Sequence, residues 1–103
     1  MVAEIRTADE FQQVLQSPGL VAIKFFADWC GPCKMMTPVF AELAERYPDV
    51  VARSVDVEAD ALQDVCEQNG IQSLPTFRFY RAGTLVATVL GANKQKVEAA
   101  FKM

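Results

Sequence analysis

The stretch "FFADWCGPCKMM", residues 25–36, places two cysteines, Cys30 and Cys33, between a predicted strand and a predicted helix. Residues 20–27, "LVAIKFFA", are almost entirely apolar, as expected of a strand that is covered on both faces. Apolar residues at helical spacing then predict a helix over residues 36–47. A Cys-x-x-Cys pair at this junction can hold half of a metal site, form a structural disulfide, or switch between dithiol and disulfide.

Helical and strand patterns alternate along the rest of the chain. A capping box at residues 7–10 begins a helix, and residues 50–57 form the next apolar strand. Further elements are expected at residues 62–66 (a short helix), 75–80 and 84–90 (the strands of a hairpin that turns at Ala82 and Gly83), and 97–101 (a last helix). The order β-α-β-α-β-α-β-β-α predicts one α/β domain over residues 1–103, with a mixed five-stranded sheet flanked by four helices.

The composition disfavours several classes of protein. Hydrophobic residues make up 51% of the 103 residues and charged residues 22%, so the chain can bury a core and is not expected to be disordered. A formal net charge of −3 argues against a nucleic-acid partner, which would require a basic patch. No apolar run approaches the roughly 18–20 residues that span a membrane, so no membrane partner is expected either.

The N-terminus and the cysteine count lead us to expect a cytoplasmic protein. Residues 1–11, "MVAEIRTADEF", show no basic segment followed by an apolar stretch, so no signal peptide is visible. Three cysteines are an odd number and too few for a secreted disulfide scaffold. Nothing in the sequence requires an oligomer, and we expect a monomer.

The chain has no histidine, which removes several kinds of site at once. Cys–His nucleophilic pairs, Ser–His–Asp triads and Cys/His zinc sites all need an imidazole. A metal site made of thiolates needs four ligands, and this chain offers one pair plus Cys66, so the remaining metal alternative is a cluster shared between two chains. Cys66 shares a helical face with Leu62 and Val65, which predicts apolar packing, with a regulatory thiol as the alternative.

The local pattern favours redox chemistry for the cysteine pair. Cys30 is expected at the N-terminal end of the helix, where free N–H groups and the helix dipole favour a thiolate. Cys33 lies about one turn later and deeper. Pro32 suits the first turn because it lacks an N–H, and Gly31 leaves room for a bulky substrate. The sequence therefore predicts an exposed attacking thiol with a resolving thiol beneath it.

These residues, with others at matching spacing, show that the chain resembles the thioredoxin family. The similarity extends over nearly the whole chain. It is carried by Trp29-Cys30-Gly31-Pro32-Cys33-Lys34, Pro38, Leu74-Pro75-Thr76, Gly83 and Gly91. The Gly-Pro dipeptide between the cysteines points to the reducing branch, because oxidases and isomerases of the superfamily usually carry histidine there.

The resemblance implies a protein-disulfide reductase. Cys30 would attack a target disulfide, and Cys33 would then attack Cys30 and release the reduced target. No bound cofactor is implied, because the Cys30–Cys33 disulfide is the redox group, and NADPH is used indirectly through a flavin-containing thioredoxin reductase. Protein disulfides such as those of peroxiredoxins or ribonucleotide reductase are the expected substrates.

The resemblance also implies a docking surface for the target. The proline matching Pro75 is cis in the family, and the backbone at Leu74 pairs with an extended target segment. Trp29 is expected to be a partly exposed platform rather than a core aromatic. The implied apolar docking patch consists of Trp29, Gly31, Pro32, Leu74, Pro75, Gly91 and Ala92.

Lys24 departs from the family pattern. The family usually has a buried aspartate at this position, which is assigned to proton transfer at the second cysteine, and the frequent lysine partner on the next strand is replaced by Ser54. One interpretation is that the stem of Lys24 crosses the core edge and its ammonium reaches water or a carboxylate. The other is chemical: a neutral amine accepts the Cys33 proton, or an ammonium stabilises the Cys33 thiolate.

Two other functions remain open on the sequence alone. The chain could be a specialised or non-catalytic binding module of the same fold, because Lys24 removes the usual acid/base group. It could also be a disulfide oxidase or isomerase, although the Gly31-Pro32 dipeptide and the absent signal peptide count against this. A reduction potential would separate a reductase from an oxidase.

Overall fold

The computed structural model describes residues 2–103, which form one five-stranded mixed sheet. The strand order across the sheet is β1 (Ala3–Ile5), β3 (Val51–Asp56), β2 (Leu20–Phe26), β4 (Thr76–Arg81) and β5 (Thr84–Leu90). The first three of these strands run parallel, whereas β4 is antiparallel to β2 and to β5. The strand that precedes the cysteine pair is therefore central and has neighbours on both sides, as its apolar sequence predicts.

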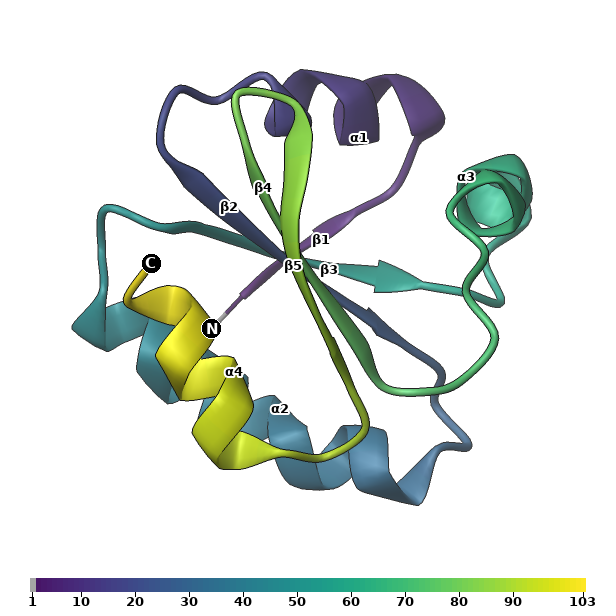
Figure 1. Cartoon of the computed structure of the whole chain (residues 1–103). Coiled ribbons are helices and arrows are strands. Elements are labelled where there is room, and N and C mark those ends of the chain that lie inside the picture. The colour runs from purple at the N-terminus through teal and green to yellow at the C-terminus, as the bar shows by residue number, and fades with distance from the viewer. Residues whose placement is uncertain (1) are drawn as a thin grey trace.

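Four helices cover the two faces of the sheet (Figure 1). The long helix α2 (Gly31–Arg46) and the C-terminal helix α4 (Lys94–Phe101) lie together on one face. Helix α1 (Ala8–Leu15) and the short α3 (Gln63–Gln68), which follows a 3₁₀ turn η1 (Asp60–Leu62), lie on the other face. The predicted fold class, a mixed sheet of five strands flanked by four helices, is confirmed.

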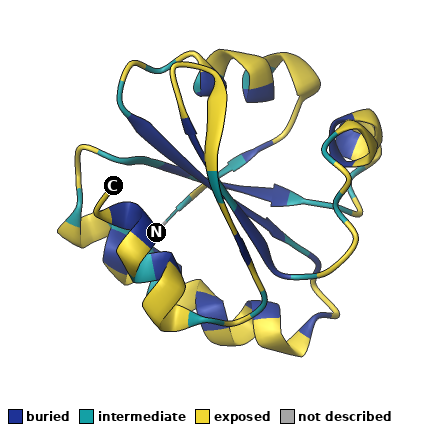
Figure 2. Cartoon of the chain, in the orientation of Figure 1, coloured by how far each residue is buried: buried dark blue, intermediate teal, exposed yellow. Residues whose placement is uncertain are grey.

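Each face of the sheet has its own apolar core, as the buried strand segments of Figure 2 illustrate. Because side chains alternate along a strand, Ala22 packs toward α2 and α4, and Ile23 toward α1 and α3. Aromatic rings fill the first core, where Phe40 of α2 contacts Phe77 and Phe101 with ring centroids 5.6 Å apart. Lys24 follows Ile23, so its side chain points to the α2 face of the sheet.

Local sequence signals define the ends of several elements. Thr7 caps α1, because its Oγ1 accepts a hydrogen bond from the Glu10 N–H at 3.1 Å. The reciprocal bond runs from the Arg6 N–H to Glu10 Oε1 at 2.7 Å. The turn between β4 and β5 places Ala82 and Gly83 at positive φ, 52° and 82°. The capping box and the hairpin turn are thus confirmed.

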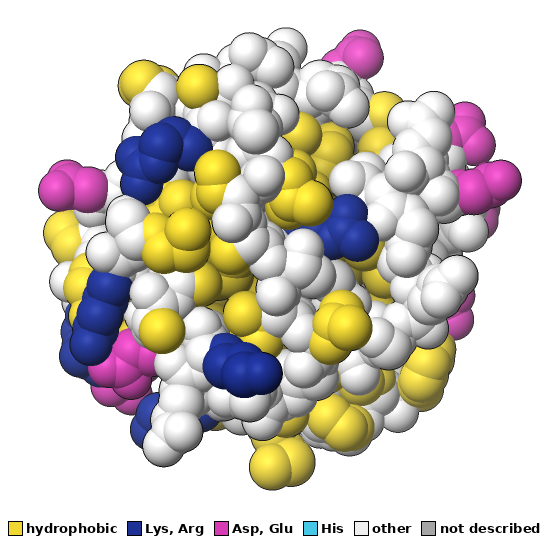
Figure 3. All heavy atoms as spheres, viewed as in Figure 1, with side chains coloured by type: hydrophobic (Ala, Val, Ile, Leu, Met, Phe, Trp, Pro, Cys, Tyr) yellow, Lys and Arg dark blue, Asp and Glu magenta, His cyan; other side chains and the backbone are white. Residues whose placement is uncertain are grey.

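Strand β5 is an edge of the sheet and carries exposed apolar side chains. Leu85, Val86 and Leu90 are all exposed. In Figure 3, hydrophobic side chains reach the surface of this face between scattered Lys and Arg side chains. None of the helices in residues 2–103 combines the length and the apolar character needed to cross a membrane.

Candidate active site

Cys30 and Cys33 form a disulfide where the central strand gives way to α2. Strand β2 ends at Phe26, and Cys30 is the N-cap residue of the helix, with extended backbone angles. The Cα atoms of Cys30 and Cys33 are 5.2 Å apart, a spacing that suits a disulfide. The strand-to-helix position predicted for the pair is confirmed, and the helix begins directly after Cys30.

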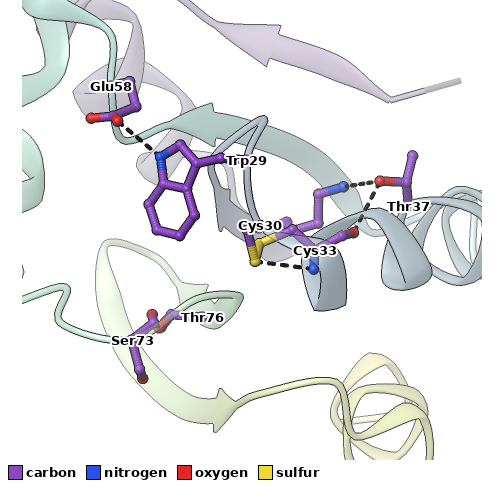
Figure 4. Close-up of a disulfide and its surroundings, with 8 residues drawn as sticks. Trp29, Cys30, Cys33, Thr37, Glu58, Ser73 and Thr76 are labelled. Carbon is purple, nitrogen blue, oxygen red and sulfur yellow. Dashed lines mark hydrogen bonds between the residues drawn. A yellow bond between two sulfur atoms is a disulfide. The ribbon is translucent and has the colours of Figure 1, made fainter.

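The helix terminus favours negative charge on the Cys30 sulfur. Its Sγ accepts a hydrogen bond from the Cys33 backbone N–H, with a sulfur–nitrogen distance of 3.2 Å (Figure 4). This N–H is one of the donors of the first turn that have no partner within the helix. Pro32 lies in that first turn, where an N–H would have no partner within the helix, so the N–H that proline lacks costs no hydrogen bond. A Cys30 thiolate would receive the same bond and the favourable end of the helix dipole, which lowers a thiol pKa.

The expectation that Cys30 is exposed is wrong for the oxidised protein. Cys30 is only 4% exposed and Cys33 2%. The reason is packing, because the disulfide forms a small apolar cluster with Ala27, against which Leu74 also packs. Access to Cys30 is through a pocket of about 410 Å³ lined by Trp29, Cys30, Gly31, Pro32, Val57, Ile71, Gln72 and Leu74.

Trp29 stands beside this pocket and is 70% exposed. Its indole Nε1–H donates a hydrogen bond of 2.9 Å to Glu58 Oε1 (Figure 4). Glu58 is itself positioned by its backbone N–H, which donates to Asp56 Oδ1 at 2.9 Å. The predicted exposure of Trp29 is confirmed. The sequence does not predict that Glu58 anchors Trp29, because the two residues are 29 positions apart along the chain.

The segment before β4 brings three of the predicted docking residues together. The Leu74–Pro75 peptide bond is cis, as the resemblance implies. Leu74 lines the same pocket as Cys30, and the carbonyl of Pro75 accepts the Gly91 N–H at 2.9 Å. Thr76 Oγ1 donates to the Ser73 carbonyl at 2.6 Å and braces the turn. Ala92 follows Gly91 and is exposed.

Lys24 is buried, with an exposed fraction of 6%. It lies opposite Ser54 on β3 and Phe77 on β4. Its Nζ donates to Thr37 Oγ1 at 3.1 Å, and this hydroxyl donates to the Cys33 carbonyl, also at 3.1 Å. Within residues 2–103 no carboxylate lies within ion-pair distance of Nζ. Lys24 therefore does not form the ion pair with a carboxylate that one interpretation of the sequence proposed. Burial lowers the pKa of Lys24 below its ordinary value.

Cys66 is a packing residue, as predicted. It is buried in the second core with Leu62 and Val65. Burial, and secondly the charge of Asp56, raise the pKa of the Cys66 thiol and disfavour the reactive thiolate. Among residues 2–103, no group of three or more Cys, Asp or Glu side chains is arranged to hold a metal ion.

Comparisons with known proteins agree with this geometry. The family model described as "Thioredoxin" matches residues 2–102. The chain belongs to the thioredoxin family. It is 45% identical to the thioredoxin of Equus caballus over 104 residues, 99% of this chain and 97% of that protein.

Solved structures of thioredoxins are similar in fold. The chain resembles the thioredoxin of Plasmodium falciparum with a TM-score of 0.91 and 37% identity, covering 98% of this chain and 97% of that one. A similar chain, with TM-score 0.90, 31% identity and coverages of 98% and 93%, comes from work on thiol resolution in a yeast mitochondrial 1-Cys peroxiredoxin via the glutathione and thioredoxin systems.

Family and geometry together establish the class of activity. The protein is a thiol-disulfide oxidoreductase of the protein-disulfide reductase type, and its redox group is the Cys30–Cys33 disulfide rather than a bound cofactor. Its partners are, in general terms, a thioredoxin reductase and proteins that carry disulfides. A non-catalytic binding module is not favoured, because both cysteines are present and joined.

Proposed function

We propose that Cys30 is the attacking and Cys33 the resolving cysteine in the reduction of protein disulfides. The observation that carries this assignment is the hydrogen bond from the Cys33 N–H to Cys30 Sγ at the start of α2. A sulfur in this place is stabilised as a thiolate and borders the open pocket. Cys33 lies within the helix and is not among the residues that line this pocket, as suits a thiol that attacks the neighbouring Cys30 rather than the target.

The target binds across the pocket beside Cys30 in this proposal. Trp29 and Leu74 line the pocket, and Pro75 is linked through its carbonyl to Gly91. Leu74 precedes strand β4, so its backbone is placed to pair with an extended segment of the target. Ala92 extends the same surface beyond Gly91. Recognition through backbone and apolar contacts suits a protein that reduces many different targets.

Peroxiredoxins and ribonucleotide reductase are the proposed substrates. The similar yeast chain was studied with a mitochondrial 1-Cys peroxiredoxin, which supports the first of these classes. Thioredoxin reductase would return the Cys30–Cys33 disulfide to the dithiol, with NADPH as the source of electrons.

We further propose a cytoplasmic location and a monomeric state. A reducing compartment keeps both active cysteines available between catalytic cycles. Imaging of the chain with a fluorescent protein fused to its C-terminus would test the location, and sedimentation would test the monomer.

A trapping experiment tests the assignment of the two cysteines. In the Cys33→Ser variant, attack by Cys30 still forms a mixed disulfide but the resolving step is lost. The variant, offered a peroxiredoxin oxidised to its disulfide, should accumulate a covalent complex that dithiothreitol releases and whose cross-link maps to Cys30. Cys66→Ser added to the same chain should leave the yield unchanged. A complex formed equally well by Cys30→Ser, with Cys33 intact, would contradict the assignment.

A further inference from the structure

Lys24 and Cys33 line the same cavity, which opens partly to the surface. This cavity measures about 260 Å³ and lies between β2 and the first turns of α2. Since a water molecule occupies about 30 Å³ in the liquid, the space is large enough for several waters beside the two side chains. The cavity differs from the substrate pocket, because it is reached from the side of Cys33 and not of Cys30.

The amino group of Lys24 has few polar contacts there. Within residues 2–103, its single side-chain hydrogen bond runs to Thr37 Oγ1, and this hydroxyl bonds in turn to the carbonyl of Cys33. Nζ therefore lies one hydroxyl away from the residue that must lose a proton during catalysis. A buried amine without a counter-charge loses much of its preference for the charged form.

Two aromatic rings make the protonated state attainable. Nζ lies 5.4 Å from the ring centroid of Phe26 and 5.8 Å from that of Phe40. Ring faces at these distances attract a cation. Burial thus favours the amine before a proton arrives, and the rings, together with a thiolate at Cys33, favour the ammonium afterwards.

We propose that Lys24 is the proton acceptor for Cys33 in the resolving step, acting through water in the shared cavity. This inference rests on the proposed function, since it assumes that Cys33 resolves a mixed disulfide held on Cys30. It assigns a catalytic-cycle role to the charged residue that replaces the family's usual aspartate, and it makes Thr37 a positioning residue.

The Cys33 thiol gives its proton to the neutral Lys24 amine, which becomes an ammonium. The Cys33 thiolate attacks Cys30 Sγ, so that the Cys30–Cys33 bond forms while the bond from Cys30 to the target sulfur breaks. The electron pair of the broken bond leaves with the target, whose thiolate takes a proton from water. Lys24 then loses its extra proton to solvent through the cavity.

The other charged groups that line the cavity are Asp28 and Lys34, and both are exposed. Ser54 contributes a neutral hydroxyl from β3. Solvent screens the two exposed charges, so the buried amine is the group placed to exchange a proton with Cys33.

Rapid mixing of the reduced protein with the disulfide reagent DTNB tests the proposal. Attack by Cys30 releases one thionitrobenzoate in a first phase, and resolution by Cys33 releases the second. The first phase depends on the proposed function and the second on the inference, so the two can fail separately. Both phases would be followed from about pH 6 to about pH 9.

Three variants make the test specific. Lys24→Met keeps the buried stem without a proton acceptor, Lys24→Arg keeps a charge that accepts no proton, and Lys96→Met removes an exposed lysine on α4 as the matched control. We expect Lys24→Met and Lys24→Arg to slow the second phase by about tenfold or more at neutral pH and to leave the first phase unchanged. Lys96→Met should alter neither phase. A wild-type second phase in Lys24→Met, or in Lys24→Arg, would overturn proton acceptance by Lys24.

A second measurement on the unaltered protein does not depend on how the variants fold. With lysines labelled with ¹³C at Cε, NMR reports the titration of each side chain, and Lys24 is assigned as the buried lysine by its slow exchange. We expect Lys24 of the oxidised protein to titrate below the ordinary value of 10.5, and the second-phase rate to rise with the fraction of amine. A midpoint at or above 10.5 would overturn the proposal.

Discussion

Lys24 is the one charged residue on a strand whose other six residues are apolar. Among residues 2–103, its Nζ donates a hydrogen bond to the Thr37 hydroxyl and lies over the rings of Phe26 and Phe40. At the scale of the residue, this placement has a thermodynamic consequence. The folded protein disfavours the ammonium, whereas the unfolded chain does not. Lys24 therefore lowers the stability of the fold at any pH at which the unfolded chain carries the ammonium.

The stability of the oxidised protein should therefore depend on pH through Lys24. Because the folded pKa lies below the ordinary 10.5, the unfolded chain binds more protons between these two values, and the free energy of unfolding contributed by Lys24 rises with pH across that window. Below the folded pKa the cost is present in full. We expect Lys24→Met to be more stable than the wild type by about 1 kcal/mol at neutral pH, with the difference shrinking as the pH approaches 10.5.

Urea unfolding of the oxidised wild type and the Lys24→Met variant at a series of pH values measures this difference. All other groups titrate in both proteins and cancel. A difference that stays constant would show that Lys24 is as easily protonated in the folded state as in the unfolded one, and a difference that grows with pH would show that it is more easily protonated in the folded state.

At the scale of the elements, the loop after β3 supports the loop before α2. Glu58 holds the indole of Trp29, and Trp29 borders the pocket that leads to Cys30. Since the indole is exposed and does not pack in the core, this hydrogen bond does more for its orientation than for the stability of the fold.

Glu58→Ala should therefore raise the KM for a protein disulfide by about fivefold and leave kcat nearly unchanged, because the lost hydrogen bond contributes about 1 kcal/mol. The chain has one tryptophan, so the fluorescence anisotropy of Trp29 reports its mobility directly and should fall in the variant. Glu67→Ala, an exposed carboxylate on α3, is the matched control. An unchanged KM together with an unchanged anisotropy would remove Glu58 from this role.

The hairpin between β4 and β5 offers a second test at this scale. Gly83 has a φ of 82°, and an added Cβ would lie 3.3 Å from Gln16 Nε2, whereas Ala82 has a φ of 52° with a side chain already present. Gly83→Ala should lower the free energy of unfolding by about 1–2 kcal/mol, and Ala82→Gly should raise it by about 0.5 kcal/mol. Thermal unfolding of the two variants checks both signs. Equal effects would mean that the turn does not hold these angles in solution.

The sequence predicts the elements well because their signals are local. The Thr7 capping box, the turn at Gly83 and the apolar strand before Cys30 each need only a few neighbouring residues. The contacts that it misses join distant parts of the chain. Trp29 meets a carboxylate 29 residues away, and Lys24 meets a hydroxyl 13 residues away on another element. Neither pairing can be inferred before the topology is known.

The clearest error is the prediction that Cys30 is exposed. It too arises because the contacts that decide burial join distant parts of the chain. A residue at the start of a helix is usually open to solvent, and the Gly31-Pro32 dipeptide adds little bulk. Cys30 is covered by its own disulfide and by Val57 and Leu74, which pack against the same cluster from distant parts of the chain. The identity of the chemical groups could be predicted from the sequence, but their exposure depends on the assembled fold.

At the scale of the whole molecule, the direction of electron flow depends on the reduction potential. Thioredoxins have reduction potentials of about −270 mV, whereas strong disulfide oxidases have potentials of about −120 mV. The Gly31-Pro32 dipeptide favours the reducing end of this range. Lys24 opposes this effect where it holds the proton of Cys33, because an ammonium beside a Cys33 thiolate stabilises the reduced form.

Lys24→Met should therefore shift the potential by about 30 mV to more negative values, equivalent to about 1.4 kcal/mol for this two-electron couple. Equilibration of the wild type and the variant with glutathione redox buffers, read by the fluorescence of Trp29, measures both potentials. A shift to less negative values would contradict the stabilising role of Lys24 toward the reduced form. A wild-type value near that of the oxidases would contradict the assignment as a reductase.

The reduction of insulin disulfides, driven by NADPH and a thioredoxin reductase, is the most direct assay of the assigned activity. We expect steady NADPH consumption by the wild type, loss of at least about a hundredfold in rate for Cys30→Ser, and an unchanged rate for Cys66→Ser, whose thiol is buried away from the site. A Cys30→Ser variant that turns over at the wild-type rate, or a correctly folded wild type that does not reduce insulin, would contradict this assignment.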